Sequence, residues 1–408
     1  MNLNEINSYW YVIGASVIII ISYLFNLVSK KWSIPSVLLL IALGIVLRYT
    51  TGIENIDGES PLLGSLGVVG LIMIVLEASL DLELKKEKIA LIIKSFSVAI
   101  IALSLSTYLL SLIIQVFFEI EAFVSLVYAI PLSIMSSAII IPSVSKLSAD
   151  KKEFMIYEST FSDILGIMFF YFLLGSVEYQ NAHDLGWSIA GNILLTVVIS
   201  IVLSYALIFL FQNIKTNVKL FLLIAVLILL YAVGKMLHLS SLIIILFFGL
   251  ILNNRNLFFR GFIKKYIHPE ELTPIFKDFK LITEETAFVV RTFFFIIFGI
   301  TISLSNLFSL NVFVVSILML ALLYGIRFLS LKLILRHNFR TELFIAPRGL
   351  ITVLLFFAIP SQYQVPDFES GILLFLIIAS SIIMAVALIK HDKQKLITDN
   401  ESSSITEI

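Results

Sequence analysis

The chain has 408 residues, of which 59% are hydrophobic and 14% carry a charged side chain, and its formal net charge is zero. Soluble domains carry about 25% charged residues, so this composition excludes an ordinary soluble protein and indicates a polytopic protein of the lipid bilayer. The zero net charge gives no reason to expect a nucleic-acid partner. The absence of cysteine excludes disulfides, thiolate metal sites and cysteine nucleophiles.

Apolar runs of about 20 residues, the length needed to cross roughly 30 Å of hydrocarbon, recur along the whole chain. Residues 254–283 are basic and amphipathic, and we expect an interfacial helix or linker there. Residues 391–408 are predicted to form a short, disordered cytoplasmic tail. The sequence predicts 13 membrane-spanning helices, at approximately 8–29, 32–50, 61–80, 88–116, 122–146, 154–177, 185–211, 217–236, 239–253, 284–305, 310–334, 341–360 and 369–389.

Lysine and arginine concentrate in alternate connections between these spans, with Arg48 and Lys235 as the clear exceptions. Because basic residues favour the cytoplasmic side, we place the N-terminus outside and the C-terminus in the cytoplasm. The first residues, MNLNEINSYW, lack the basic region and the cleavage site of a signal peptide. We therefore expect a multi-pass protein of the plasma or inner membrane.

Two spans are interrupted in a matching way. The fifth contains Pro131 and Pro142 around a serine cluster, and the twelfth contains Pro347 and Gly349 in its middle. Proline breaks helical hydrogen bonding, and freed backbone groups are tolerated at membrane depth only where protein or a watery cavity covers them. The two spans are an odd number of spans apart, so they point in opposite directions. This pattern favours inverted repeats with two crossed discontinuous helices, although two unrelated kinks remain an alternative.

Three charged residues lie too deep to reach the membrane surface: Glu158, Asp163 and Arg348. Asp163 is about 14 Å along its span, where a lone charge costs roughly 2.5–3.5 kcal/mol and usually marks an ion or proton pathway. Helical geometry places Glu158 and Asp163 roughly 140° apart, so we expect separate roles. Our hypothesis is a structural Glu158–Arg348 ion pair and a working Asp163. Asp163 as a polar bridge between helices stays open.

Other charges lie near the ends of their spans. We expect Arg327 to reach the membrane surface along its aliphatic stem. Arg291 is expected to pair with Glu284 or Glu285 at the cytoplasmic mouth.

The segment ESTFSDILG, residues 158–166, is similar to the Glu-x-x-x-Asn-Asp signature of the sodium/proton antiporter family, within the cation:proton antiporter superfamily. APRGLIT resembles the arginine motif on the family's second crossed helix, and LVYAIPLSIMSSAIIIPSV resembles the first crossed helix. SKKWSIPSVLLLIALGIVL is similar to the opening hairpin, and IVLEASLDLEL to the end of the third span. The likeness covers roughly residues 8–390, and it rests on the order and spacing of these motifs together.

The resemblance implies that Asp163 is the essential carboxylate, that Glu158 is the structural glutamate and that Arg348 is the arginine of the crossed helix. It also implies a homodimer and a single transmembrane domain over residues 1–390. That domain would divide into a core and a scaffold joined by the linker. The core would comprise about 61–177 and 284–389, and the scaffold about 8–50 and 217–253.

The chain departs from the family pattern at two places. Ser162 stands where the electroneutral branch usually has asparagine, and Ser136–Ser137 stands where many members carry Thr-Asp. We therefore expect one titratable carboxylate, Asp163, to bind either a proton or an alkali cation, with Ser162, Ser136 and Ser137 supplying further oxygens. Competition at Asp163 gives electroneutral one-for-one antiport of Na⁺ or K⁺, with Li⁺ a further candidate. No other cofactor is expected.

Two other classes of transporter remain as alternatives, a cation-coupled solute symporter and a cation channel. A symporter needs an organic-substrate pocket, for which the sequence offers no second polar cluster at midplane. An enzyme is not expected, because the serines of the interrupted span, Ser136 and Ser137, have no histidine or lysine base nearby in sequence. The histidines lie in loops or near span ends without metal-ligand spacing: His183, His238, His268, His337 and His391.

Overall fold

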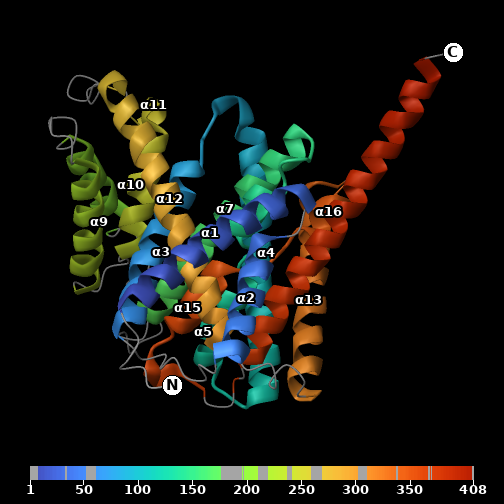
Figure 1. Ribbon diagram of the computed structural model, residues 1–408, viewed down its shortest axis with the longest axis horizontal. Coiled ribbons are helices and arrows are strands. Elements are labelled where there is room, and N and C mark those ends of the chain that lie inside the picture. The colour runs from blue at the N-terminus through green and yellow to red at the C-terminus, as the bar shows by residue number, and fades with distance from the viewer. Residues whose placement is uncertain are drawn as a thin grey trace.

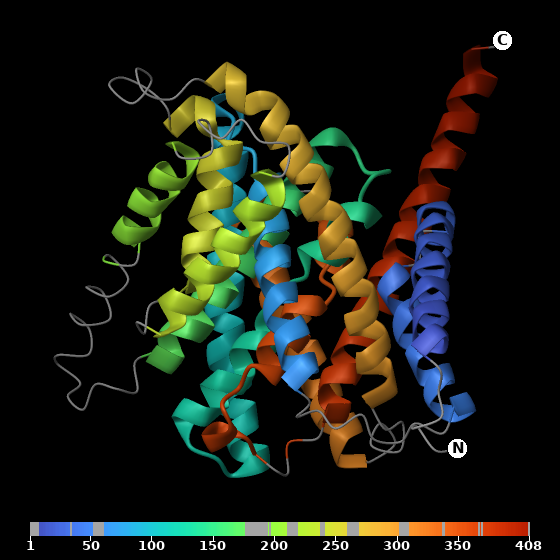
Figure 2. The ribbon, with the colours of Figure 1, turned by 60° about the vertical axis from the view of Figure 1, so that its left-hand side comes forward.

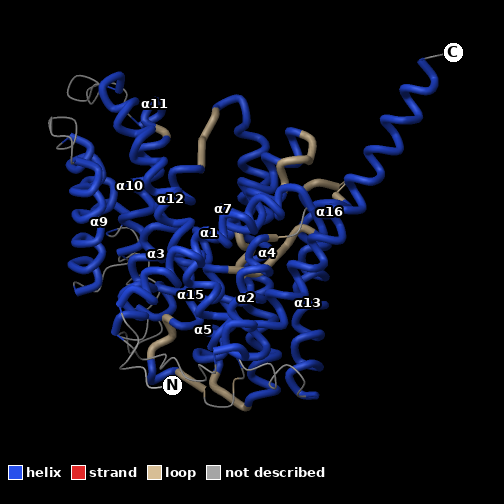
Figure 3. Tube along the Cα trace, viewed as in Figure 1, coloured by secondary structure: helices blue, strands red, loops and turns tan. Residues whose placement is uncertain are grey.

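The computed structural model describes residues 8–32, 35–51, 61–175, 195, 197–209, 219–236, 241–258, 269–301, 310–336, 339–365, 368 and 370–406. Within these ranges the regular structure is helical and no strand occurs (Figure 3), which confirms the predicted all-α class. The elements are α1 (Ser8–Trp32), α2 (Ser36–Thr51), α3 (Pro61–Asp81), η2 (Lys86–Lys88), α4 (Ile89–Phe118), α5 (Ala122–Ser133), α6 (Ser137–Ser143), α7 (Ala149–Gly175), α9 (Lys219–Met236), α10 (Ser241–Asn253), α11 (Arg255–Phe258), α12 (Pro269–Thr301), α13 (Leu310–Ile334), α14 (Arg340–Phe344), α15 (Leu350–Phe357), η6 (Ser361–Tyr363) and α16 (Ser370–Thr406).

The helices follow the predicted spans closely, with the fifth span divided into α5 and α6 and the twelfth into α14 and α15. Among the described residues, six helical segments are long and apolar enough to cross a membrane, and four shorter apolar helices accompany them. The seventh predicted span, 185–211, is described as a continuous helix only over Val197–Phe209. Apart from residue 195, the rest of that span lies outside the described residues.

Two helices extend further than the sequence suggested. α12 begins at Pro269, so the second half of the expected linker is continuous with the tenth span. α16 continues to Thr406 and projects beyond the other helices (Figures 1 and 2), so the tail expected to be disordered is described as helix through that residue. An apolar run marks only the part of a helix that lies in hydrocarbon, and it therefore says little about where the helix ends.

The helices pack in two groups. One, which we call the crossing bundle, comprises α4, α5, α6, α7, α13, α14, α15 and α16. The other, the flanking bundle, comprises α1, α2, α3, α9, α10 and α12. Figure 1 shows α9, α10 and α12 on one side and α4, α13 and α16 on the other. The third span, α3, packs mainly against α10, and the tenth span, α12, packs mainly against α2. The division into a core and a scaffold stays a prediction.

Glycines hold α3 and α12 in the flanking bundle by allowing close approach. A Cβ atom added at Gly44 of α2 would lie 2.9 Å from the Cα of Gly299 on α12. Likewise, a Cβ at Gly249 of α10 would lie 2.9 Å from the Cβ of Ser79 on α3. Small residues of this kind drive helix association in membranes, where lipid removes the hydrophobic preference for burial. Figure 2 shows the long α12 running beside α3.

The connection between α3 and α4 joins the two bundles and is held from both sides. The Asn254 side chain, at the end of α10, donates to Leu82 O over 2.8 Å and accepts from Leu84 N over 2.5 Å. From the crossing bundle, the Tyr157 hydroxyl donates to Glu83 O over 2.7 Å. Two hydrogen bonds with Asn254 therefore fix this connection to the flanking bundle, and one hydrogen bond from Tyr157 fixes it to the crossing bundle.

We predict that Gly44→Ala destabilises the protein, because the new methyl group meets the Ile296 carbonyl oxygen and the Gly299 Cα atom. Overpacking of this kind costs about 1–3 kcal/mol. The apparent melting temperature, measured as loss of the monodisperse species after heating, should fall by several degrees. Gly14→Ala is the matched control, because a Cβ there meets nothing within 4 Å. Equal melting of the two variants would contradict the packing argument.

Candidate functional site

The two breaks in the crossing bundle touch each other directly. The helix is interrupted between Ser133 and Ser137, and again between Phe344 and Leu350. At the crossing, the Ser136 backbone N–H donates to the carbonyl oxygen of Pro347 over 2.9 Å. Each break thus satisfies one backbone group of the other, which is how irregular backbone is tolerated at membrane depth.

Two glycines make this crossing possible. A Cβ atom at Gly349 would lie 2.8 Å from the Cβ of Ser136, and one at Gly166 would run into the Ile134 side chain. Gly349 therefore brings the second break against the first, and Gly166 brings α7 against the first break. A larger residue at either position would push the segments apart.

Asp163 lies on α7 beside the first break and is 2% exposed. Its Oδ2 atom accepts a hydrogen bond from the Ser137 backbone N–H over 3.0 Å. That N–H opens α6, where the first amides of a helix lack helical partners and carry partial positive charge. The other carboxylate oxygen, Oδ1, is buried and has no hydrogen-bond partner within the described residues. The carboxylate is thus oriented through one oxygen, while the second is left available.

The serines predicted for this site gather around the same break. Ser162 Oγ accepts from the Met135 backbone N–H over 3.0 Å. Ser136 Oγ is buried and lacks a hydrogen-bond partner in the part of the chain that the structure describes. Ser137 contributes its backbone N–H to Asp163. The four residues predicted to bind ions therefore adjoin the first break, and their roles in binding remain predictions.

The predicted Glu158–Arg348 ion pair is wrong. Glu158 pairs instead with Arg327 of α13, with Nη1 to Oε1 at 2.6 Å and Nη2 to Oε2 at 3.1 Å. Both side chains are buried, 1% exposed for Glu158 and 5% for Arg327. Such a bidentate, charge-assisted contact is the strongest type of hydrogen-bonded pair. Arg327 does not reach the membrane surface, because it lies on the buried face of α13 and its side chain points towards α7.

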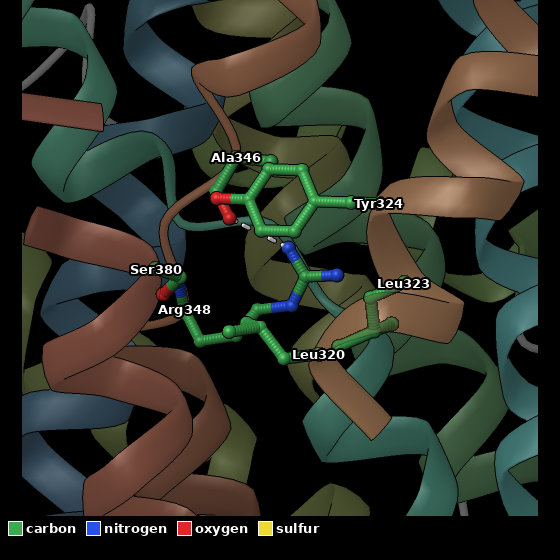
Figure 4. Close-up of a pocket in the computed structure, with 6 residues that line it drawn as sticks. All are labelled: Leu320, Leu323, Tyr324, Ala346, Arg348 and Ser380. Carbon is green, nitrogen blue, oxygen red and sulfur yellow. Dashed lines mark hydrogen bonds between the residues drawn. The ribbon is translucent and has the colours of Figure 1, made fainter. Parts of the chain in front are cut away.

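Arg348 satisfies backbone carbonyl groups that the breaks leave without helical partners. Its Nε donates to Leu132 O over 3.0 Å, and its Nη1 donates to Ala346 O over 2.8 Å (Figure 4). Its own backbone N–H donates to Ser380 Oγ over 2.9 Å. Figure 4 also shows the Tyr324 ring from α13 beside the guanidinium group. Arg348 therefore holds the ends of both breaks rather than a carboxylate.

Arg327 likewise donates hydrogen bonds to backbone carbonyl groups, here those at the end of α14. Its Nη2 donates to Glu342 O over 2.7 Å, and its Nε donates to Leu343 O over 3.1 Å. A cation at the C-terminal end of a helix is favourable because the last carbonyls carry partial negative charge. The Glu342 side chain pairs with Lys151 at the start of α7 over 3.1 Å. Arg327 consequently ties α7, α13 and α14 together.

A small cavity lies beside this network. Its volume is about 20 Å³, enough for about one water molecule. The polar and charged side chains that line it come from α4, α5, α7, α13 and the second break: Ser106, Ser133, Glu158, Ser162, Arg327 and Arg348. It thus connects the ion pair to Ser162, the neighbour of Asp163 in the chain.

Arg291 also has a different partner from the one expected. Its Nη2 atom lies 2.9 Å from Glu77 Oε1 and 3.1 Å from Oε2. Glu284 faces Lys280 at 3.8 Å, and Lys280 also pairs with Asp81 at 2.7 Å. These contacts join α3 to α12 within the flanking bundle.

We predict that Glu158→Gln destabilises the protein strongly, because it strands the buried Arg327 guanidinium without a counter-charge. Breaking one partner of a buried pair costs about 3–5 kcal/mol, and the double variant Glu158→Gln/Arg327→Met should recover part of the loss. Lys85→Gln is the control, because its pair with Glu83 is 44% and 58% exposed and should contribute no more than about 1 kcal/mol. The measurement is the apparent melting temperature of each variant. Equal melting temperatures for Glu158→Gln and Lys85→Gln would refute the prediction.

This chain is similar to known proteins both in its sequence family and in its fold. The family model described as sodium/hydrogen exchanger, transmembrane, matches residues 16–391. The structure of the sodium proton antiporter MjNhaP1 from Methanocaldococcus jannaschii at pH 8 shares the fold. It superposes with a TM-score of 0.67 at 19% identity, covering 93% of this chain and 98% of that one. An electron-microscopy structure of the same antiporter gives a TM-score of 0.63 at 19% identity, covering 94% and 95%. Comparison with curated protein sequences gives no match.

Proposed function

Because this chain belongs to the sodium/hydrogen exchanger family, we propose that it exchanges Na⁺ or K⁺ for protons by competition of the two ions for Asp163. The observation that carries the proposal is the state of this carboxylate. Asp163 is 2% exposed, and its Oδ1 has no partner among the described residues while Oδ2 is held by Ser137 N–H. A buried carboxylate in this position is best satisfied by a proton or a small cation.

The chemistry of exchange follows from that competition. With the proton bound on Oδ1, Asp163 is neutral, and the buried unpaired oxygen carries no negative charge. With the proton released, the charged carboxylate attracts a cation, and Ser136 Oγ supplies a second unpaired oxygen. Since a cation and a proton do not occupy the same oxygen together, one is released when the other binds. Alternating exposure of Asp163 to the two sides of the membrane then gives antiport.

The charges around the crossing favour electroneutral exchange. Glu158 is already neutralised by Arg327, and Ser162, Ser136 and Ser137 bear no charge. Within the described site, Asp163 is then the one carboxylate that can exchange a bound proton for a bound cation. One proton therefore exchanges for one monovalent cation in this proposal.

For the conformational change, we propose that the crossing bundle moves against the flanking bundle, with α3 and α12 on the flanking side. The proposed assembly is a homodimer in the plasma or inner membrane, with the N-terminus outside and the C-terminus in the cytoplasm. The basic connections of the sequence support this orientation. Li⁺ is a further candidate substrate, because the oxygen ligands proposed here bind hard cations in general.

We predict that Asp163→Asn abolishes cation-dependent proton movement, because an amide binds neither ion as a carboxylate does. The measurement uses purified protein in liposomes with a trapped pH dye, an imposed proton gradient, and Na⁺ or K⁺ added outside. Asp150→Asn, an exposed acid on the same helix, should keep wild-type exchange. Full exchange by Asp163→Asn would refute the proposed site. Solute uptake or ion conductance without proton countertransport would favour a symporter or a channel instead.

A second prediction concerns the membrane potential. Initial rates of Na⁺/H⁺ exchange should be the same with and without valinomycin when K⁺ is equal on both sides, because no net charge moves per cycle. An electrogenic cycle would build a voltage opposing further turnover by about 2.3 kcal/mol per charge per 100 mV. Acceleration on clamping, or a voltage generated by turnover, would rule out one-for-one exchange.

A further inference from the structure

Thr160 of α7 carries an unexplained buried hydroxyl. Most buried hydroxyls on these helices donate to a carbonyl of their own helix: Ser159 Oγ bonds Met155 O at 2.8 Å, and Thr283 Oγ1 bonds Phe279 O at 2.8 Å. Thr160 is 0% exposed, yet its Oγ1 atom has no hydrogen-bond partner in the described ranges. An unpaired hydroxyl inside a protein is costly, so this oxygen calls for a partner.

The position of Thr160 on α7 points to that partner. Residues three apart on a helix are surface neighbours, about 5–6 Å between Cβ atoms, so Thr160 adjoins Asp163. Around the helix axis, Thr160 lies about 60° from Asp163 on one side, while Ser162 lies about 100° away on the other. Ser162 is bound to Met135 N. Thr160 therefore flanks Asp163 on the side that the first break does not occupy.

Three buried oxygens are thus left unpaired among the described residues, two on α7 and one on the first break that meets it: Thr160 Oγ1, Asp163 Oδ1 and Ser136 Oγ. Asp163 lies between Thr160 on one side and the first break on the other. We propose that Thr160 Oγ1 is a ligand of the transported cation when it binds Asp163. A threonine hydroxyl has two acceptor lone pairs and a rotatable hydrogen, so it can turn a lone pair towards a cation.

This inference rests on the proposed function and deepens it by separating the two ions. A proton needs one carboxylate oxygen, whereas an alkali cation needs several oxygens at once. Thr160 therefore contributes to binding of the cation and not to binding of the proton. Because hydroxyl ligands define the size of the cage, Thr160 also contributes to the preference among Na⁺, K⁺ and Li⁺.

The test compares Thr160→Val with Thr160→Ser. Valine keeps the β-branched shape and removes the oxygen, and serine keeps the oxygen. In proteoliposomes, Thr160→Val should raise the KM for Na⁺ or K⁺ about tenfold or more and change the ratio of the two KM values. The pH dependence of exchange at saturating cation should stay unchanged. Thr160→Ser should remain near the wild type.

Thr107→Val is the matched control. Thr107, on α4, is also buried with an unpartnered hydroxyl among the described residues, and it should leave both KM values unaltered. If Thr160→Val keeps wild-type KM values and selectivity while Asp163→Asn is inactive, Thr160 is not a ligand but the proposed function stands. If Asp163→Asn still exchanges ions, the proposed function fails and the Thr160 site fails with it. If Thr160→Val does not fold, Thr160→Ala is measured in its place. The proposal is then judged by the KM values for Na⁺ and K⁺ and by their ratio in that variant.

Discussion

The structure depends on satisfying the backbone groups that two broken helices expose at membrane depth. In hydrocarbon, an unpaired carbonyl or N–H group costs several kcal/mol, so each break requires partners from within the protein. The breaks satisfy each other through Ser136 N–H and Pro347 O. Side-chain oxygens of Ser162, Asp163 and Ser380 accept from N–H groups of the breaks. Two arginines bind carbonyl groups: Arg348 binds Leu132 O and Ala346 O, and Arg327 binds the last carbonyls of α14. Buried arginine suits this task because it offers five donors in a fixed fork.

The choice of arginine brings a second constraint, because a guanidinium group stays charged. Glu158 neutralises the charge of Arg327, so one carboxylate of α7 has a structural role. Asp163, five residues later on the same helix, faces the opening of α6 instead. The 140° turn between the two positions thus separates a carboxylate that neutralises a structural charge from one that retains an unpaired oxygen. The same helix therefore carries one acid in an ion pair and one acid with an unpaired oxygen, the oxygen at which we propose that ions bind.

Among the described residues, the crossing bundle and the flanking bundle share few contacts, and the α3–α4 connection is one place where they are joined. Asn254 attaches this connection to α10, and the Tyr157 hydroxyl attaches it to α7. The close glycine contacts of α2 with α12 and of α3 with α10 make the flanking bundle tight within itself. Tight packing within each bundle and sparse contact between them would allow the movement proposed above.

The sequence alone determined the class of protein, the approximate spans, the positions of the two breaks and the depth of Asp163. These features follow from composition, from proline chemistry and from the fixed rise of a helix, all of which are local. The tertiary structure decided which charges pair. Arg327 lies near enough to the end of its span to be taken for a surface-reaching residue, and Arg291 lies near Glu284 in sequence, but their partners are Glu158 and Glu77.

The bundle to which α3 and α12 belong was likewise decided only in three dimensions, as was the unpaired state of the Thr160 hydroxyl. The physical reason is the same in each case. An apolar span records its length and its breaks, but the neighbours of a helix depend on close packing between segments far apart in the chain, such as Gly44 against Gly299. Local patterns do not encode such contacts, and so the sequence located the carboxylates while the fold assigned their partners.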